Sequence, residues 1–204
     1  MGKKIKLLIL TGIVGSSMLL SGCLFWDNEL GKLKEAFKGR EAVIETYDEN
    51  SNVIDRIEGK SISVSREDKF DTKNENGETT KQSSVLNFTV GGKSMVHVGS
   101  SLIMYEKGLT NIFEDYNKKM DIQNYDSSMP ILDRIVNNAK NFTTGKRRVI
   151  LIRSQSGEPL ATFVGNNVGY FKTGMEKTTG IQIDGKYLFI YRCDYTIYDM
   201  DLLG

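Results

Sequence analysis

Apolar and polar residues alternate along most of the chain, in two separate runs. The first run covers residues 40–109 and the second covers residues 146–204. Alternation with a period of two is typical of half-buried β-strands, and Gly91-Gly92 and Asp184-Gly185 are dipeptides that favour two-residue hairpins. We therefore predict twelve strands, over 42–47, 53–58, 61–65, 85–90, 93–98, 102–106, 148–153, 160–164, 168–172, 179–183, 186–192 and 195–199.

Between the two runs the period changes to that of a helix. Apolar residues at helical spacing predict one amphipathic helix over 109–120 and a second over 128–145, so that residues 110–145 form a helical segment. The stretch 66–82 is polar, with Phe70 as its only large apolar residue. It is expected to form a mobile loop or the end of a long exposed hairpin.

The two runs match each other at constant offsets, which indicates an internal duplication. An offset of 106 aligns Gly59 with Gly165, and an offset of 93 aligns Gly92-Lys93 with Gly185-Lys186. The alternative is that two unrelated β meanders share the same alternation. The expected fold class is α+β, predominantly antiparallel β. Two pseudo-repeated six-strand units would close into a barrel or a two-sheet stack, with the two helices between them.

The chain begins with the features of a secretory signal. Basic residues precede a charge-free apolar segment, 7–20, that is too short for a stable membrane span. The residues Leu20-Ser21-Gly22-Cys23 resemble the bacterial lipobox. The resemblance implies cleavage between Gly22 and Cys23, with diacylglycerol on the Cys23 thiol. This reading predicts a signal peptide over 1–22, a membrane-proximal tether over 23–39 and a single globular domain over 40–204, on the extracytoplasmic face of the cell membrane.

Charge and residue types exclude several classes of function. After removal of the leader's three lysines, 24 Lys+Arg face 26 Asp+Glu, so no basic excess points to nucleic acid. One histidine and one remaining cysteine cannot build a zinc site, and neither a metal nor a cofactor is expected. The residues Asp48, Asn50 and Asn52 resemble the start of a calcium loop. Val53 stands where that loop needs glycine, so a turn is predicted there instead.

Two known families share short stretches with this chain. The residues 47–60, from Tyr47-Asp48-Glu49-Asn50 to Ile57-Glu58-Gly59-Lys60, resemble the repeated hairpin of tubby-like or LURP-one-type barrels. The stretches 39–50, 143–157 and 191–201 resemble a family of roughly 200-residue lipoproteins of unknown function from Gram-positive bacteria, catalogued as DUF5052. The tubby-like resemblance implies a twelve-strand barrel, whereas the second resemblance implies no activity.

These observations predict a non-enzymatic surface lipoprotein that binds a protein or lipid partner or supports envelope assembly. The membrane is its expected partner through lipidated Cys23, no catalytic residue is assigned, and the oligomeric state is left open. The alternative is an envelope hydrolase in which His97 acts with Ser100, Ser101 or Cys193. A base must lie within hydrogen-bond reach of its nucleophile, so the geometry around His97 distinguishes the two.

Overall fold

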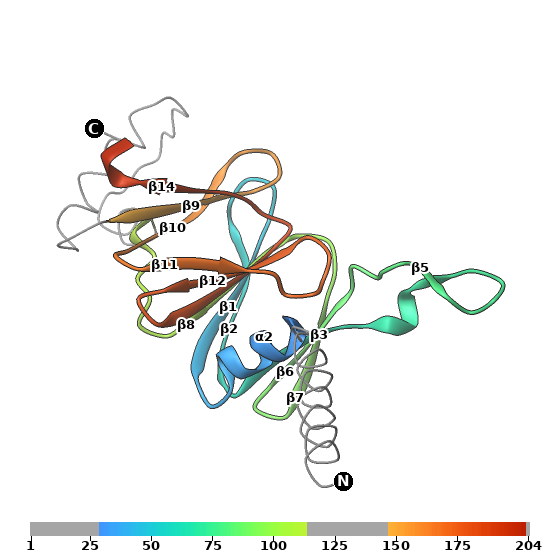
Figure 1. Cartoon of the computed structure of the whole chain (residues 1–204). Helices are drawn as coiled ribbons and strands as arrows, with labels where there is room; N and C mark the ends of the chain where they lie inside the picture. The colour runs from blue at the N-terminus through green and yellow to red at the C-terminus, as the bar shows by residue number, and fades with distance from the viewer. Residues whose placement is uncertain (1–28, 114–146, 203–204) are drawn as a thin grey trace, which may run out of the picture.

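The computed structural model describes residues 29–113 and 147–202 (Figure 1). This part of the chain is mostly antiparallel β-structure, and α2 (Glu29–Phe37) is its one complete α-helix. Each of the twelve predicted strand segments is a strand, with ends within two residues of the prediction. They are β1 (Glu41–Tyr47), β2 (Val53–Lys60), β3 (Ile62–Arg66), β6 (Leu86–Val90), β7 (Lys93–His97), β8 (Ser101–Glu106), β9 (Arg148–Arg153), β10 (Pro159–Gly165), β11 (Val168–Phe171), β12 (Thr178–Ile183), β13 (Lys186–Tyr191) and β14 (Asp194–Asp199).

Strand pairing within residues 41–106 is repeated within residues 148–199. In the first half β1 pairs with β2 and β8, and β6 pairs with β3 and β7. In the second half β9 pairs with β10 and β14, and β12 pairs with β11 and β13. Ile44 lies opposite Ile57, and its counterpart Ile150 lies opposite Phe163. All four ladders keep the register that the offsets of 106 and 93 specify, and register is set by which face is buried.

The strands assemble into three stacked sheets. The central sheet has six strands in the order β11-β12-β13-β8-β1-β2, and two three-stranded sheets, β3-β6-β7 and β10-β9-β14, lie on its two faces. One core, which includes Ile44, Phe88 and Phe189, fills the space toward the β3-β6-β7 sheet. A second core, which includes Ile103, Phe163 and Ile181, fills the space toward the β10-β9-β14 sheet. The outer face of that sheet is covered by Ile112, Phe113 and Met200, the last from the short helix η2 (Met200–Leu202).

The predicted fold class is wrong in how the halves are assembled. Instead of closing into a barrel or a two-sheet stack, the halves join along one edge, where β8 pairs with β13, and no sheet among the described residues closes. The helix seen in the described part precedes the first strand, whereas two helices were expected between the halves. Most of that segment, 114–146, lies outside the described residues. Alternation fixes which face of a strand is buried, but it does not specify which edge the strand offers to a partner.

Helix α2 belongs to the globular part of the chain. The buried side chains of Leu33, Ala36 and Phe37 line one face of this helix and enter the core beneath the β3-β6-β7 sheet. The Phe37 ring packs 6.2 Å from the Tyr187 ring, centroid to centroid. The segment 23–39 was expected to be a tether, but its second half is part of the folded core.

A glycine at the end of one strand in each half lets the hairpin pack closely. A Cβ at Gly59 would lie 2.1 Å from Cγ1 of Val90, and a Cβ at Gly165 would lie 2.5 Å from Cγ2 of Ile183. These two glycines are counterparts at the offset of 106, and their neighbours are counterparts at the offset of 93. The matching glycines in the sequence therefore mark a repeated close contact.

The polar stretch 66–82 forms an exposed hairpin end, one of the two structures expected for it. It contains the 3₁₀ turn η1 (Asp68–Phe70) and two short strands, β4 (Thr72–Lys73) and β5 (Thr79–Lys81), which extend away from the sheets (Figure 1). Its base is fixed by the nearly buried Asp71 carboxylate, which accepts two hydrogen bonds from Arg66 at 2.7 and 2.8 Å. The second half has no counterpart of this hairpin, in agreement with the difference of 13 residues between the two offsets.

Candidate functional site

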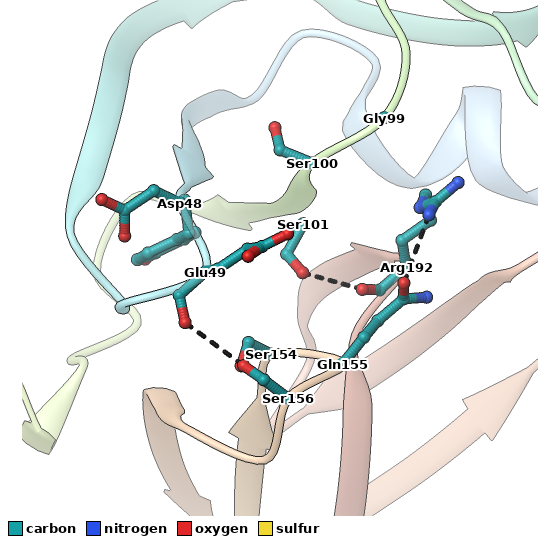
Figure 2. Close-up of a pocket in the computed structure, with 10 residues that line it drawn as sticks. Asp48, Glu49, Gly99, Ser100, Ser101, Ser154, Gln155, Ser156 and Arg192 are labelled. Atoms are coloured by element: carbon teal, nitrogen blue, oxygen red, sulfur yellow. Dashed lines mark hydrogen bonds between the residues drawn. The ribbon is translucent and has the colours of Figure 1, made fainter.

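A polar pocket lies where four strand-connecting turns meet (Figure 2). The turns are 48–52 and 98–100 from the first half and 154–158 and 192–193 from the second. The pocket has a volume of about 590 Å³, and the residues that line it are Tyr47, Asp48, Glu49, Gly99, Ser100, Ser101, Ser154, Gln155, Ser156 and Arg192. Each turn of the first half has its repeat counterpart in the second, so the pocket lies between equivalent parts of the two halves.

The turns 48–52 and 154–158 have the same internal hydrogen bonds. The Asp48 amide donates to the carbonyl of Asn52 at 3.0 Å, and the Ser154 amide donates to the carbonyl of Glu158 at 2.7 Å. In each turn the first side chain also accepts from the fifth amide, at 2.8 Å to Asp48 Oδ1 and 3.1 Å to Ser154 Oγ. Asp and Ser both stabilise tight turns in this way. The predicted turn at 48–52 is present, and it presents Glu49 to the pocket.

The other two turns share a left-handed backbone at equivalent positions. Gly99 has a φ of 103°, which glycine adopts readily, and its counterpart Arg192 has a φ of 52°. An arginine in this region is uncommon and must be held by its surroundings. The Arg192 amide donates to the carbonyl of Lys177 at 2.9 Å, and its carbonyl accepts from the Ser101 hydroxyl at 2.8 Å. These contacts fix the arginine at the edge of the pocket.

The two walls of the pocket differ in charge. Asp48 and Glu49 lie on one side, and Gln155 and Arg192 lie on the other (Figure 2). The side chain and backbone amide of Asn52, together with the Asn50 amide, hold the pKa of the Asp48 carboxyl below its usual value. The Asp48 oxygens are therefore used within the turn, whereas the exposed Glu49 carboxylate is available to a ligand.

Arg192 has an incompletely satisfied guanidinium. Its Nη2 donates to Oε1 of Gln155 at 3.2 Å, and its buried Nε has no hydrogen-bond partner among the described residues. A buried donor without an acceptor costs about 1–3 kcal/mol. The pocket is thus bordered by a cation that lacks part of its hydrogen bonding.

The residues of the alternative hydrolase site lie at this end of the molecule, and the protons of Ser101 and Cys193 point to backbone carbonyls. His97 Nε2 lies 3.0 Å from the carbonyl oxygen of Ser100. The Ser101 hydroxyl donates to the Arg192 carbonyl, and the Cys193 thiol donates to the carbonyl of Tyr191 at 3.3 Å. The contacts described here therefore direct Ser101 and Cys193 to backbone carbonyls rather than to the His97 ring. Gly22 and the lipidation residue Cys23 lie outside the described residues.

Cys193 is expected to be unreactive in the folded protein. Burial raises the pKa of its thiol from 9.0 to about 12, so the thiolate is scarce at pH 8. In a Cys23→Ser variant, where Cys193 is the remaining cysteine, alkylation by iodoacetamide at pH 8 should be about a hundredfold slower than in urea, because the thiolate fraction falls about a thousandfold and the higher nucleophilicity of a high-pKa thiolate offsets part of that fall. Because the folded pKa lies above the unfolded one, the thiol's contribution to stability is complete below pH 9 and is lost between pH 9 and 12. Equal rates in buffer and urea would contradict this burial.

Sequence reasoning missed most of the pocket. The sequence indicates Asp48 as a calcium-loop candidate and Ser100 and Ser101 as possible partners of His97, but it assigns no site to Glu49, Ser154, Gln155 or Arg192. The available signal was positional, because Asp48 and Ser154 are separated by 106 residues and Gly99 and Arg192 by 93. The separations of 106 and 93 residues are the two repeat offsets. They place the four turns at the same end of equivalent strand pairs in the two halves.

Comparisons with known proteins identify a family without a described activity. In residues 29–113 and 147–202, no three His, Cys, Asp or Glu side chains form a group that could hold a metal ion. No helix in the same residues has the length and apolar character needed to cross a membrane. Neither a curated protein nor a solved structure matches the chain. The model of a family described as a domain of unknown function, DUF5052, matches residues 3–203, and the chain therefore belongs to this family.

Proposed function

We propose that this protein is a lipid-anchored envelope protein that binds a ligand in the four-turn pocket without converting it. The lipobox-like residues 20–23 support the anchor, since a diacylglyceryl group on Cys23 provides the two acyl chains that stable attachment needs. The observation that carries the binding role is the pocket itself, because its polar side chains converge from both halves of the molecule. Small-ligand sites orient their ligands with a few fixed polar groups in a concave surface, and this pocket provides such groups.

The contacts around His97 favour binding over hydrolysis. A serine or cysteine nucleophile needs a base that accepts its proton. Here the Ser101 and Cys193 protons are directed to carbonyl oxygens, and burial keeps the Cys193 thiol protonated. The Ser101 hydroxyl has a structural role instead, because it joins the start of β8 to the turn between β13 and β14.

The anchor is tested by exchanging one atom in each of the two cysteines. Cys23→Ser should move the protein out of the detergent phase in a two-phase partition, because the hydroxyl does not accept the diacylglyceryl group. Cys193→Ser is the matched control, and this protein should stay in the detergent phase with its mass unchanged. Partition measured by immunoblot, together with intact mass, provides the readout. A Cys23→Ser protein with unchanged mass and unchanged partition would exclude lipidation at this residue.

A further inference from the structure

We propose that the four-turn pocket binds a small zwitterion, such as an amino acid or a short peptide. Its carboxylate would lie against Arg192 and its ammonium group against Glu49. The proposal rests on the binding function proposed above and specifies the ligand of the same pocket. It is based on which charged groups of the pocket remain available once the contacts within the protein are made.

Arg192 is suited to a carboxylate. Its Nη2 contacts the neutral amide of Gln155, and its buried Nε has no acceptor among the described residues. Guanidinium donors form a planar fork that matches two carboxylate oxygens, and such charge-assisted pairs are stronger than contacts to neutral groups. A bound carboxylate would add a charged acceptor at the terminal Nη groups, since Nε itself is buried and closed to a ligand. The left-handed backbone at Arg192, held by Ser101 and Lys177, keeps the side chain at this wall.

Glu49 is suited to an ammonium group. Its backbone is fixed because its carbonyl accepts from the Ser156 hydroxyl at 3.2 Å, across the boundary between the two halves. Its carboxylate is exposed, whereas the neighbouring Asp48 carboxylate is bound within its own turn. Glu49 is therefore the acidic side chain of this wall that a ligand can reach.

The two charged groups face the pocket from opposite walls without neutralising each other. Among the described residues, no guanidinium nitrogen of Arg192 lies within 4.0 Å of a Glu49 carboxylate oxygen, so the two side chains form no ion pair. The volume of about 590 Å³ is within the usual range for small-molecule sites. Of the serines that line the pocket, Ser101, Ser154 and Ser156 use their hydroxyls in contacts within the protein, and the Ser100 hydroxyl can bond the polar middle of a peptide. The repeat counterparts of the two charged residues are Gln155 and Gly99, so the charge separation arises from substitution within the duplicated turns.

The probe is glycylglycine, compared with its N-acetyl and C-amide forms. Binding to the folded Cys23→Ser chain is followed by amide chemical shifts in NMR titrations. We expect the free dipeptide to shift resonances of the pocket turns, and each blocked form to bind at least tenfold more weakly. Glu49→Gln and Arg192→Gln should each weaken binding of the free dipeptide about tenfold or more. Arg192→Lys should give an intermediate loss, because it keeps the charge but not the fork.

Matched controls lie on the hairpin outside the pocket. Glu75→Gln and Lys81→Gln remove one charge of each sign there and should leave the affinity unchanged. Equal binding of the free and blocked dipeptides would overturn the zwitterion proposal. A neutral disaccharide that shifts the pocket residues while glycylglycine does not would overturn the ligand class and leave the pocket as a binding site. If none of these probes shifts the pocket residues, both the ligand class and the binding role are contradicted, whereas the anchor is judged separately by partition.

Discussion

Replacement of Glu45 by alanine is expected to lower the free energy of unfolding by about 3 kcal/mol. The Glu45 side chain is 1% exposed, and its carboxylate accepts from the Tyr47 hydroxyl at 2.7 Å and from the Tyr105 hydroxyl at 3.3 Å. It also forms an ion pair with Arg56. Removal of the carboxylate takes an acceptor from two buried hydroxyls and the buried counter-ion from the arginine. In a domain of this size the expected fall in melting temperature is about 6–12 °C.

The control is Glu58→Ala, which removes an exposed carboxylate that contacts the same Arg56 side chain. Glu58 is 52% exposed, and it lies 3.3 Å from Arg56. Surface ion pairs contribute about 0–1 kcal/mol, so Glu58→Ala should change stability little. Both variants lose one carboxylate that contacts Arg56, and they differ in burial. Urea unfolding of the two proteins provides the comparison, and a similar midpoint for both would show that the buried cluster adds no stability.

Gly165→Ala is expected to destabilise the protein by about 2 kcal/mol, through steric overlap in a closely packed region. The added methyl would lie 2.5 Å from Cγ2 of Ile183 and 2.9 Å from Oδ2 of Asp184. Both atoms lie at the hairpin turn between β12 and β13, so relief requires a shift of that turn. The expected fall in melting temperature is about 4–8 °C.

Gly169→Ala is the matched control, because a Cβ at that position meets no atom within 4 Å and the backbone is not left-handed. Its stability should stay within about 0.5 kcal/mol of the original protein. The double change Gly165→Ala with Ile183→Ala should be less destabilising than the sum of the two single changes, since the smaller side chain makes room for the methyl. Additive effects, or an equal loss in Gly169→Ala, would contradict the steric account.

Strand positions were predictable because their signals are local. The alternation of apolar residues and the hairpin dipeptides each lie within a few residues of the strand that they predict. The repeat added partners and register, since Ile44–Ile57 and Ile150–Phe163 lie at matching positions. The junction between β8 and β13 had no such signal. Backbone groups form this ladder, and the apolar side chains of edge and interior strands look alike in sequence.

Burial of individual residues was less predictable. The segment 23–39 was predicted as a tether, because apolar side chains at helical spacing, such as Leu33, Ala36 and Phe37, fit a membrane surface as well as a core. Glu45 would be assigned to a solvated face by its type, and its counterpart in the second half is Leu151. The pocket was missed because its residues come from four turns that are distant in sequence. His97 and Cys193 lie nearby and are residue types often found in catalytic sites, so they were the candidates that the sequence indicated.

The β8–β13 junction between the halves also bears on how two chains can associate. Residues Leu102–Tyr105 pair with Leu188–Tyr191, and the pocket takes two turns from each half. Neither contact depends on the halves belonging to the same chain. Two copies that exchanged their second halves would form the same β8–β13 ladder twice and two complete pockets. Such domain swapping would produce a dimer without any new interface, and mutations in the connecting segment would alter how readily it forms without touching either site.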